Sequence, residues 1–191
     1  MSAEIGLWEH FRKLADFNGR EDRSSFWPYA AVAFAVIMVA GMLIFVPMMA
    51  TAMSEMQQYA AQHPDQATVA SGPGHYSISV KGNHPEFFPA SSMAAFLGVT
   101  FGLAITLYAA AATRRLHDTG KSGFWALMPL PFIIYSSIMM PRVFASRGEP
   151  DMSLFFSIFF SNMLYIITLI VLIALLAGSS QLGRNRYDAG D

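Results

Sequence analysis

The segment RRLHDTGKSGFW at residues 114–125 contains residue types that serve three kinds of chemistry. Its Gly-Lys-Ser triplet is typical of loops that cradle nucleotide phosphates, the adjacent His117 and Asp118 are typical of metal hydrolases, and paired arginines bind phosphate groups. A phosphate-cradling loop would need a glycine at position 115, where this chain has Arg115, and would follow a strand rather than a long apolar segment. The sequence therefore argues against a nucleotide site.

A metal site at His117 and Asp118 would need further His or Asp ligands on the same side of the protein. His10 lies on the polar face of an expected surface helix. The remaining histidines lie in a loop expected on the opposite side and lack i,i+4 spacing: His63, His75 and His84. Cysteine is absent, which excludes thiolate ligands and cysteine nucleophiles. We therefore expect no metal site, no cofactor and no catalytic residue.

A structural interpretation of the segment fits better. Arg114 and Arg115 end an apolar helix, where they complement its C-terminal dipole. If that helix continues for one more turn, Asp118 lies i+4 from Arg114 and i+3 from Arg115, so an internal ion pair becomes available. Gly120 can close the helix in a left-handed cap, and Ser122 can cap the next one. The segment then predicts a tight polar hairpin between two helices.

The elements that position this hairpin are apolar. Of the 191 residues, 54% are hydrophobic and only 13% are charged, against about 25% charged in an ordinary soluble domain. Four runs without Lys, Arg, Asp, Glu or His span about 27–52, 91–113, 124–140 and 153–177, and about 20 apolar residues suffice to cross a bilayer. The third run is short and contains Pro129 and Pro131, which favour a kinked, tilted or re-entrant segment. We predict a single all-α domain, a polytopic membrane protein with a four-helix transmembrane bundle.

Charge in the connecting segments predicts the orientation of this bundle. A net charge of −1 provides no basic stripe for nucleic acid. One side of the predicted membrane has nine cationic residues and the other has three. The first group is Arg12, Lys13, Arg20, Arg23, Arg114, Arg115, Lys121, Arg184 and Arg186; the second is Lys81, Arg142 and Arg147. The positive-inside rule therefore places both termini in the cytoplasm.

Two further segments flank the first predicted span. Residues 5–17, IGLWEHFRKLADF, place apolar residues on one helical face and charged residues on the other, which favours an interfacial amphipathic helix over a helix docked on a partner protein. Residues 53–90 form an extracytoplasmic loop. Its beginning, MSEMQQYAAQ, extends the first helix, SGPG breaks it, and YSISV alternates like a short strand.

Small and polar residues within the spans predict how the helices pack. Gly98 and Gly102 form a small-xxx-small step that permits close helix approach. Asn162 lies on a polar stripe of the fourth helix, which we expect to face the bundle because an amide in hydrocarbon needs a hydrogen-bond partner. Since the spans contain no ionisable residue, the sequence argues against a proton pump or a coupled ion transporter.

Three motifs in this chain resemble one known family. FNGREDRSSFW at 17–27, RRLHDTGKSGFW at 114–125 and GRNRY at 183–187 occur in the order found in the domain of unknown function 805 family, the YhaH-like bacterial inner-membrane proteins. The resemblance covers nearly the whole chain. The outer loop is longer than in the short members of this family, and Asp188 stands where the family has a glycine. The resemblance implies membership and a bacterial inner-membrane location, and it implies no reaction.

The three motifs all fall on the predicted cytoplasmic face. We expect a polar cluster there comprising Asn18, Arg20, Arg23, Arg114, Arg115, His117, Asp118, Lys121, Asn185 and Arg186. One interpretation is structural, with the cluster joining the N-terminal segment, the hairpin and the tail. The other is binding, with guanidinium groups accepting an anionic headgroup or phosphate. The two are not exclusive.

These features are compatible with three classes of function. We favour a non-enzymatic scaffold or a module that binds membrane lipids or protein partners, including a second copy of the chain. A small transporter or channel is the first alternative. A membrane-substrate enzyme that uses His117 for acid–base chemistry is the second.

Overall fold

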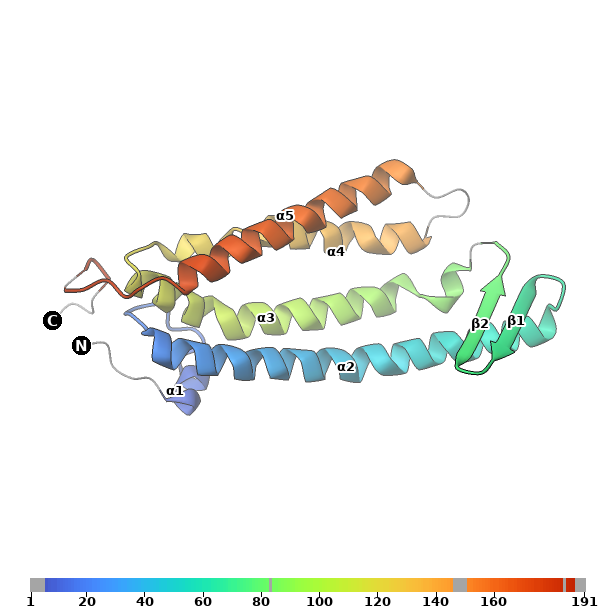
Figure 1. Ribbon diagram of the computed structural model, residues 1–191, viewed down its shortest axis with the longest axis horizontal. Helices are drawn as coiled ribbons and strands as arrows, with labels where there is room; N and C mark the ends of the chain where they lie inside the picture. The colour runs from blue at the N-terminus through green and yellow to red at the C-terminus, as the bar shows by residue number, and fades with distance from the viewer. Residues whose placement is uncertain (1–5, 83, 146–150, 184, 188–191) are drawn as a thin grey trace.

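The computed structural model describes residues 6–82, 84–145, 151–183 and 185–187. Their order is α1 (Leu7–Arg12), α2 (Arg23–Gln62), β1 (Ala67–Gly72), β2 (His75–Val80), η1 (Pro85–Phe87), α3 (Ala90–Asp118), η2 (Gly123–Leu127), α4 (Leu130–Ala145) and α5 (Met152–Leu176). The long helices lie roughly side by side in an elongated bundle (Figure 1). Four candidate spans among the described residues are long and apolar enough to cross a membrane, which confirms the predicted membrane bundle.

Helix α2 is much longer than a bilayer requires. Asp22 caps its N-terminus by accepting the Ser25 backbone N–H at 3.0 Å. Its 40 residues correspond to a length of about 60 Å, whereas the hydrocarbon core of a bilayer is about 30 Å thick. The predicted extension of the first span through residues 53–62 is confirmed, and the helix continues to Gln62.

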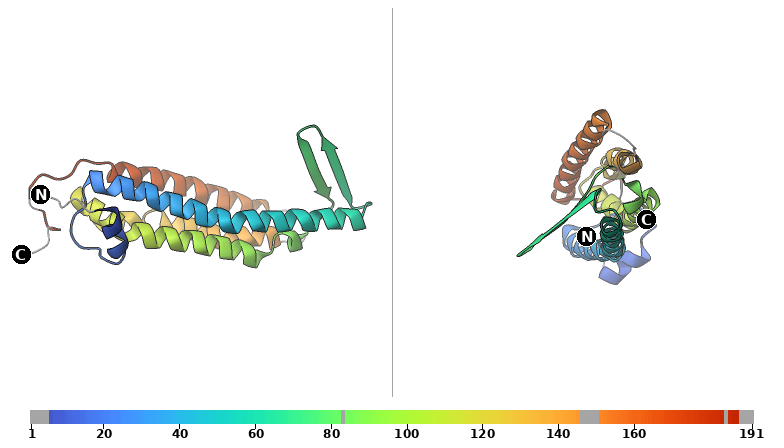
Figure 2. Two further views of the ribbon diagram at one scale, coloured as in Figure 1. Left: turned by 90° about the horizontal axis from the view of Figure 1, so that it is seen from below. Right: turned by 90° about the vertical axis from the view of Figure 1, so that its right-hand side faces the viewer.

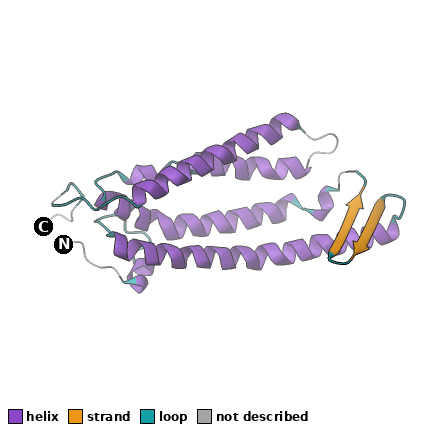
Figure 3. Cartoon of the chain, viewed as in Figure 1, coloured by secondary structure: helices purple, strands orange, loops and turns teal. Residues whose placement is uncertain are grey.

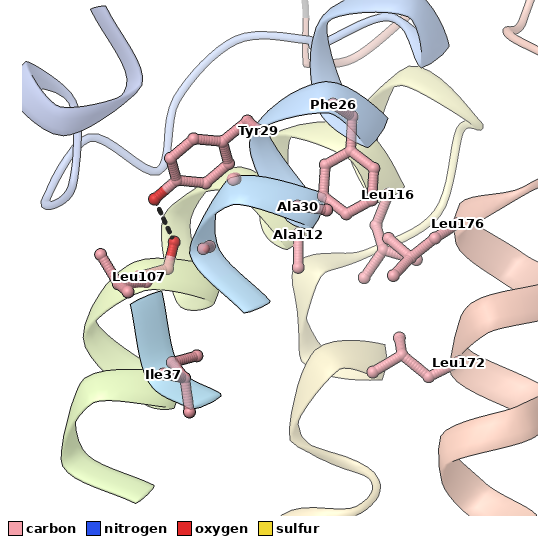
Figure 4. Packing of buried hydrophobic residues seen from close by; sticks show 11 residues of the cluster. Phe26, Tyr29, Ala30, Ile37, Leu107, Ala112, Leu116, Leu172 and Leu176 are labelled. Atoms are coloured by element: carbon pink, nitrogen blue, oxygen red, sulfur yellow. Dashed lines mark hydrogen bonds between the residues drawn. The ribbon is translucent and has the colours of Figure 1, made fainter. Parts of the chain in front are cut away.

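Helices α2 and α3 pack antiparallel through small residues and two reciprocal hydrogen bonds. The Tyr29 hydroxyl donates to the Leu107 carbonyl at 2.7 Å, and the Tyr108 hydroxyl donates to the Ala30 carbonyl at 2.6 Å. The buried cluster around these bonds comprises Phe26, Tyr29, Ala30, Ala33 and Ile37 of α2, Leu107, Ala111, Ala112 and Leu116 of α3, and Leu172 and Leu176 of α5 (Figure 4). The core therefore lies at the end of the bundle where α2 begins and where α3 and α5 end.

The predicted role of Gly98 and Gly102 is not realised within the chain. A Cβ added at either position meets no atom within 4 Å, so neither glycine faces another helix of the described chain. Gly41 of α2 lies at the contact instead, where an added Cβ would be 3.7 Å from Phe96 and Thr100 of α3. The small-xxx-small pattern did not identify this contact because spacing alone does not determine which face of a helix meets its neighbour.

Helices α4 and α5 form a second antiparallel pair. The Ser161 hydroxyl of α5 donates to the Phe132 carbonyl at 2.9 Å, and the Tyr135 hydroxyl of α4 donates to Ser157 at 2.9 Å. Part of the predicted polar stripe therefore faces the bundle. Asn162 differs, because its amide donates to the Ile158 carbonyl of its own helix at 2.9 Å and joins no neighbouring helix among the described contacts.

The third predicted span, 124–140, begins as a short 3-10 helix. Residues Gly123–Leu127 form η2, and α4 starts only at Leu130. Pro129 and Pro131 lie at this start, where proline is tolerated because the first N–H groups of a helix have no intrahelical acceptor. Together the two elements make one candidate span over Gly123–Val143. The interruption between η2 and α4, where the prolines lie, is therefore close to one end of the span.

The loop over residues 53–90 contains the one β-element of the described chain. Strands β1 and β2 pair antiparallel, with Val69 opposite Ile78, and Gly74 in the connecting turn has a φ of +73°. The predicted strand at YSISV is confirmed, and the SGPG segment forms the end of β1 and the turn. Figures 2 and 3 show the hairpin projecting beside the end of α2 that lies farthest from the core.

The interfacial helix predicted for residues 5–17 is shorter than expected. Residue 5 lies outside the described residues, and α1 ends at Arg12. Its apolar residues divide into two groups, because Phe11 and the following Leu14 pack against the core whereas Leu7 and Trp8 are exposed. The prediction that His10 lies on the polar face is wrong, since His10 is buried.

Candidate functional site

A cluster of buried charges lies where α1, α3 and the segment after α5 meet the start of α2. We call this cluster the collar and define it by His10, Arg20, Glu21, Arg114, Arg115, Asp118 and Ser180. Two carboxylates, those of Glu21 and Asp118, occupy its centre, and both side chains are fully buried. Each carboxylate binds cationic groups from separate parts of the chain.

Asp118 joins the N-terminal loop to the C-terminal segment. Its Oδ1 accepts Nε and Nη2 of Arg20 at 3.3 and 3.2 Å. Its Oδ2 accepts Nη1 of Arg115, one turn earlier on α3, and the Ser180 hydroxyl at 2.5 Å. The predicted i,i+3 ion pair between Arg115 and Asp118 is confirmed. Arg114 takes a different partner from the one considered for it.

Glu21 is that partner. Its Oε2 accepts a hydrogen bond from Nε of Arg114 at 3.0 Å and forms an ion pair with Nη2 of the same arginine, also at 3.0 Å. Its Oε1 lies 2.7 Å from Nε2 of His10. The backbone of Glu21 is also fixed on α3, because its N–H donates to the Arg114 carbonyl at 3.2 Å and its carbonyl accepts Nη1 of Arg115 at 3.4 Å. Glu21 therefore connects α1 and the following loop to the end of α3.

The remaining guanidinium donors bind backbone carbonyls. Arg115 donates to Leu176 at 2.9 Å and to Gly178 at 2.5 Å, and Arg23 donates to Ala177. Since the last carbonyls of an α-helix lack intrahelical donors, these two arginines satisfy the C-terminal end of α5 and complement its partial negative charge.

Arg20 and Arg114 extend this pattern to the loops. Arg20 donates to the carbonyls of Gln181 and Gly183 at 2.6 and 2.9 Å. Arg114 donates to the carbonyls of Lys13 and Asp16 at 3.1 and 2.5 Å. The guanidinium groups of Arg20, Arg114 and Arg115, which are buried or nearly buried, thus join the N-terminal loop, the end of α3 and the segment after α5.

The turn after α3 forms as the sequence predicts. Gly120 has a φ of +75°, its N–H donates to the His117 carbonyl, and the Lys121 N–H donates to the Leu116 carbonyl. These two bonds close the helix in a left-handed cap with the Schellman pattern. Ser122 then caps η2 by accepting the Phe124 N–H at 3.4 Å. The tight turn brings the segment after α5 against Asp118, whose carbonyl accepts the Gln181 N–H at 2.8 Å.

His117 lies beside the collar and stacks on Tyr187, with ring centroids 3.8 Å apart. Its Nδ1 is 3.2 Å from the Gly19 carbonyl, and its own carbonyl accepts the Asn185 amide at 2.9 Å. Arg186 lies over the same Tyr187 ring at 4.7 Å. The closing sequence motif therefore contacts the end of α3, as the structural one of the two interpretations expects. Arg184 of that motif lies outside the described residues.

Other predicted members of the cluster contribute less. Asn18 is exposed and its backbone N–H donates to Asp16, so its side chain makes no bond to the collar among the described contacts. Lys121 is partly buried and contributes its backbone N–H to the helix cap. Arg23 is exposed, and its guanidinium reaches the end of α5.

Sequence reasoning missed Glu21, His10 and Ser180. The strongest overlooked signal is the Glu21–Asp22 pair inside GREDR, because acidic residues between arginines next to an apolar run need partners if they are buried. Asp22, the other acidic residue of this pair, is the N-cap residue of α2. Burial raises its pKa, but hydrogen bonds from Ser24 and Ser25 and the charge of Arg115 lower the pKa more, so it lies below the usual value.

The histidines at positions 63, 75 and 84 do not gather into one site. The His63 ring stacks on Tyr59 with centroids 4.3 Å apart, and the His84 ring contacts the same tyrosine at 4.6 Å with its plane tilted by 58°. His75 is exposed at the hairpin turn. In the part of the chain that the structure describes, no group of three His, Asp or Glu side chains is placed to hold a metal ion.

Comparison with known proteins identifies a family. A family model described as protein of unknown function (DUF805) matches residues 14–189. The matched range includes all three motifs and the segments that build most of the collar, and it begins after α1. No curated protein and no solved structure matches the chain.

Proposed function

The chain belongs to the DUF805 family, and we propose that this membrane protein is a non-enzymatic scaffold that presents its apolar helices to lipids and protein partners. In this proposal the collar holds the helices in a fixed arrangement at one membrane face. The apolar surfaces of α2 to α5 that remain exposed in the single chain then serve as the contact surface.

One observation supports the structural role of the collar over a role in binding an anion. Arg20, Arg114 and Arg115 direct their donors to carboxylates and carbonyls of the same chain. An anion that entered would have to displace these bonds, and breaking a buried ion pair costs about 3–5 kcal/mol. Phosphate or headgroup binding within the collar is therefore unfavourable.

Lipid contacts are better supported at the rim of the same end. Trp8, Phe124 and Trp125 are exposed there, and aromatic side chains favour the membrane–water interface. Arg12 of α1 is exposed close by, and an exposed cation next to anionic lipid contributes about 1 kcal/mol. We further propose that this rim lies at the cytoplasmic face of the bacterial inner membrane, as the excess of cationic residues on that side indicates.

The proposal separates two effects that lipid-binding measurements can distinguish. The protein is purified in detergent, supplemented with phosphatidylglycerol or phosphatidylcholine, and examined by native mass spectrometry. We expect Arg12→Gln to lose bound phosphatidylglycerol without a change in thermal stability. Arg115→Gln should lower the midpoint of unfolding and reduce retention of both lipids, because it disrupts the helix arrangement. Arg142→Gln, at an exposed site near the end of α4, is the matched control and should leave both properties unchanged.

Two results would contradict this assignment. If Arg115→Gln left stability intact and removed only the anionic lipid, the collar would be an anion site. If purified protein converted a membrane substrate and His117→Ala abolished that turnover, the protein would be an enzyme.

A further inference from the structure

The short helix α1 is attached to the bundle through a buried histidine. His10 is 1% exposed and lies between the Tyr29 ring of α2 and the Glu21 carboxylate. The two rings are stacked, with centroids 4.3 Å apart and planes 11° from parallel. The rest of α1 is less deeply packed, since Leu7 and Trp8 are exposed.

Both nitrogens of the His10 ring face oxygen atoms that accept hydrogen bonds. Nδ1 lies 3.1 Å from the Gly6 carbonyl, and Nε2 lies 2.7 Å from Oε1 of Glu21. A neutral imidazole has one N–H, whereas the imidazolium has two. In either neutral tautomer a nitrogen lone pair would therefore point at an oxygen atom, and only the protonated ring satisfies both contacts.

The charged groups around His10 are compatible with this form. Glu21 also accepts a hydrogen bond from Nε of Arg114 of α3 and forms an ion pair with Nη2 of the same side chain. The π-face of Tyr29 of α2 is favourable to a cation. On α1 itself, the neighbouring charges are Glu9, Arg12 and Lys13, of which Glu9 and Lys13 form their own ion pair at 2.7 Å.

We propose that His10 is a proton-dependent latch: its imidazolium form holds α1 on the collar, and loss of the proton releases α1 from α2 and α3. Deprotonation removes one of the two hydrogen bonds and the charge attraction between the ring and Glu21. Once α1 is released, the chain that follows it remains attached through the packing of Leu14 and through the bonds of Arg114 to the carbonyls of Lys13 and Asp16. This inference does not depend on the scaffold function proposed above.

The absence of cysteine from the chain permits a direct distance measurement. Spin labels attached to Trp8→Cys on α1 and Phe124→Cys on η2 occupy sites that are 69% and 80% exposed, so neither label replaces a packed side chain. In full-length protein in lipid nanodiscs we expect one narrow distance distribution at about pH 5 and a broad one at about pH 9. The ratio of docked to released protein should fall roughly tenfold or more, because a hydrogen bond to a charged group contributes at least that factor.

Two variants test the origin of this response. His10→Phe keeps a ring for stacking on Tyr29 but has no N–H, so we expect a broad distribution at both pH values. His63→Phe is the matched control, because His63 also stacks on a tyrosine, Tyr59, at the far end of α2. It should retain the wild-type response.

The latch also predicts a property of the unmodified chain, which removes any dependence on the folding of a variant. Nitrogen NMR of labelled histidine should show His10 as imidazolium wherever the distance distribution is narrow, with both changing over the same pH range. A neutral His10 in protein with α1 still docked would overturn the proposal. So would identical distance distributions at both pH values, or a narrow distribution for His10→Phe.

Discussion

Removing the charge of Asp118 should destabilise the protein more than any other change of similar size. Asp118→Asn preserves the shape of the side chain, but its neutral amide replaces a carboxylate that accepts bonds from Arg20, Arg115 and Ser180. Arg115 would remain completely buried without its anionic partner.

The expected magnitude follows from this burial. Breaking a fully buried ion pair by removing one partner costs about 3–5 kcal/mol. For a chain of 191 residues, a loss of that size corresponds to a fall of the order of 10 °C in the midpoint of thermal unfolding. Arg20→Gln should cost less, because the Arg20 side chain is 14% exposed and water can partly replace its partner.

Thermal unfolding of detergent-solubilised protein, followed by tryptophan fluorescence, measures this difference. Asp65→Asn is the matched control, since Asp65 is exposed between α2 and β1 and the same substitution there should change stability by no more than about 0.5 kcal/mol. Equal midpoints for Asp118→Asn and Asp65→Asn would refute the reasoning, because they would mean that the buried arginines need no carboxylate partner.

Other substitutions test separate contacts. Tyr29→Phe or Tyr108→Phe should each cost about 1 kcal/mol, because each removes one hydroxyl bond between α2 and α3, and unfolding in denaturant measures the loss. Gly123→Ala should cost about 1–3 kcal/mol in the same assay, since the new Cβ would lie 2.4 Å from a side-chain atom of α3. Between β2 and α3, the hydrogen bond that His84 donates to the Glu86 carboxylate raises the pKa of His84 above its usual value. The bond therefore stabilises the fold fully below the unfolded-state pKa, and this contribution is lost as pH rises through the folded-state pKa. Amide exchange of residues 84–87, corrected for intrinsic rates, should show protection falling over that range, and Glu86→Gln should remove the pH dependence.

Local features of the sequence account for the architecture. The length of each apolar run requires a spanning helix, so the four spans are readable without knowledge of their neighbours. The cap at Gly120 and the i,i+3 pair of Arg115 with Asp118 are also local, because one turn of backbone brings their atoms together. Helix ends were less accurate for the third span, which was predicted over 124–140, because α4 begins at Leu130 and continues to Ala145.

The partners of the buried charges depend on the tertiary structure. Arg114 and Glu21 are separated by 93 positions, and Arg115 reaches a carbonyl 61 positions away. Spacing cannot reveal such pairs, because they form only when α1, α3 and the end of α5 are packed together. The sequence alone therefore determined that the chain crosses a membrane and where its cations lie. Only the fold decided that Arg20, Arg114 and Arg115 bind oxygen atoms of the chain itself, because in the buried collar a guanidinium group must bind whichever acceptors the packing brings within reach.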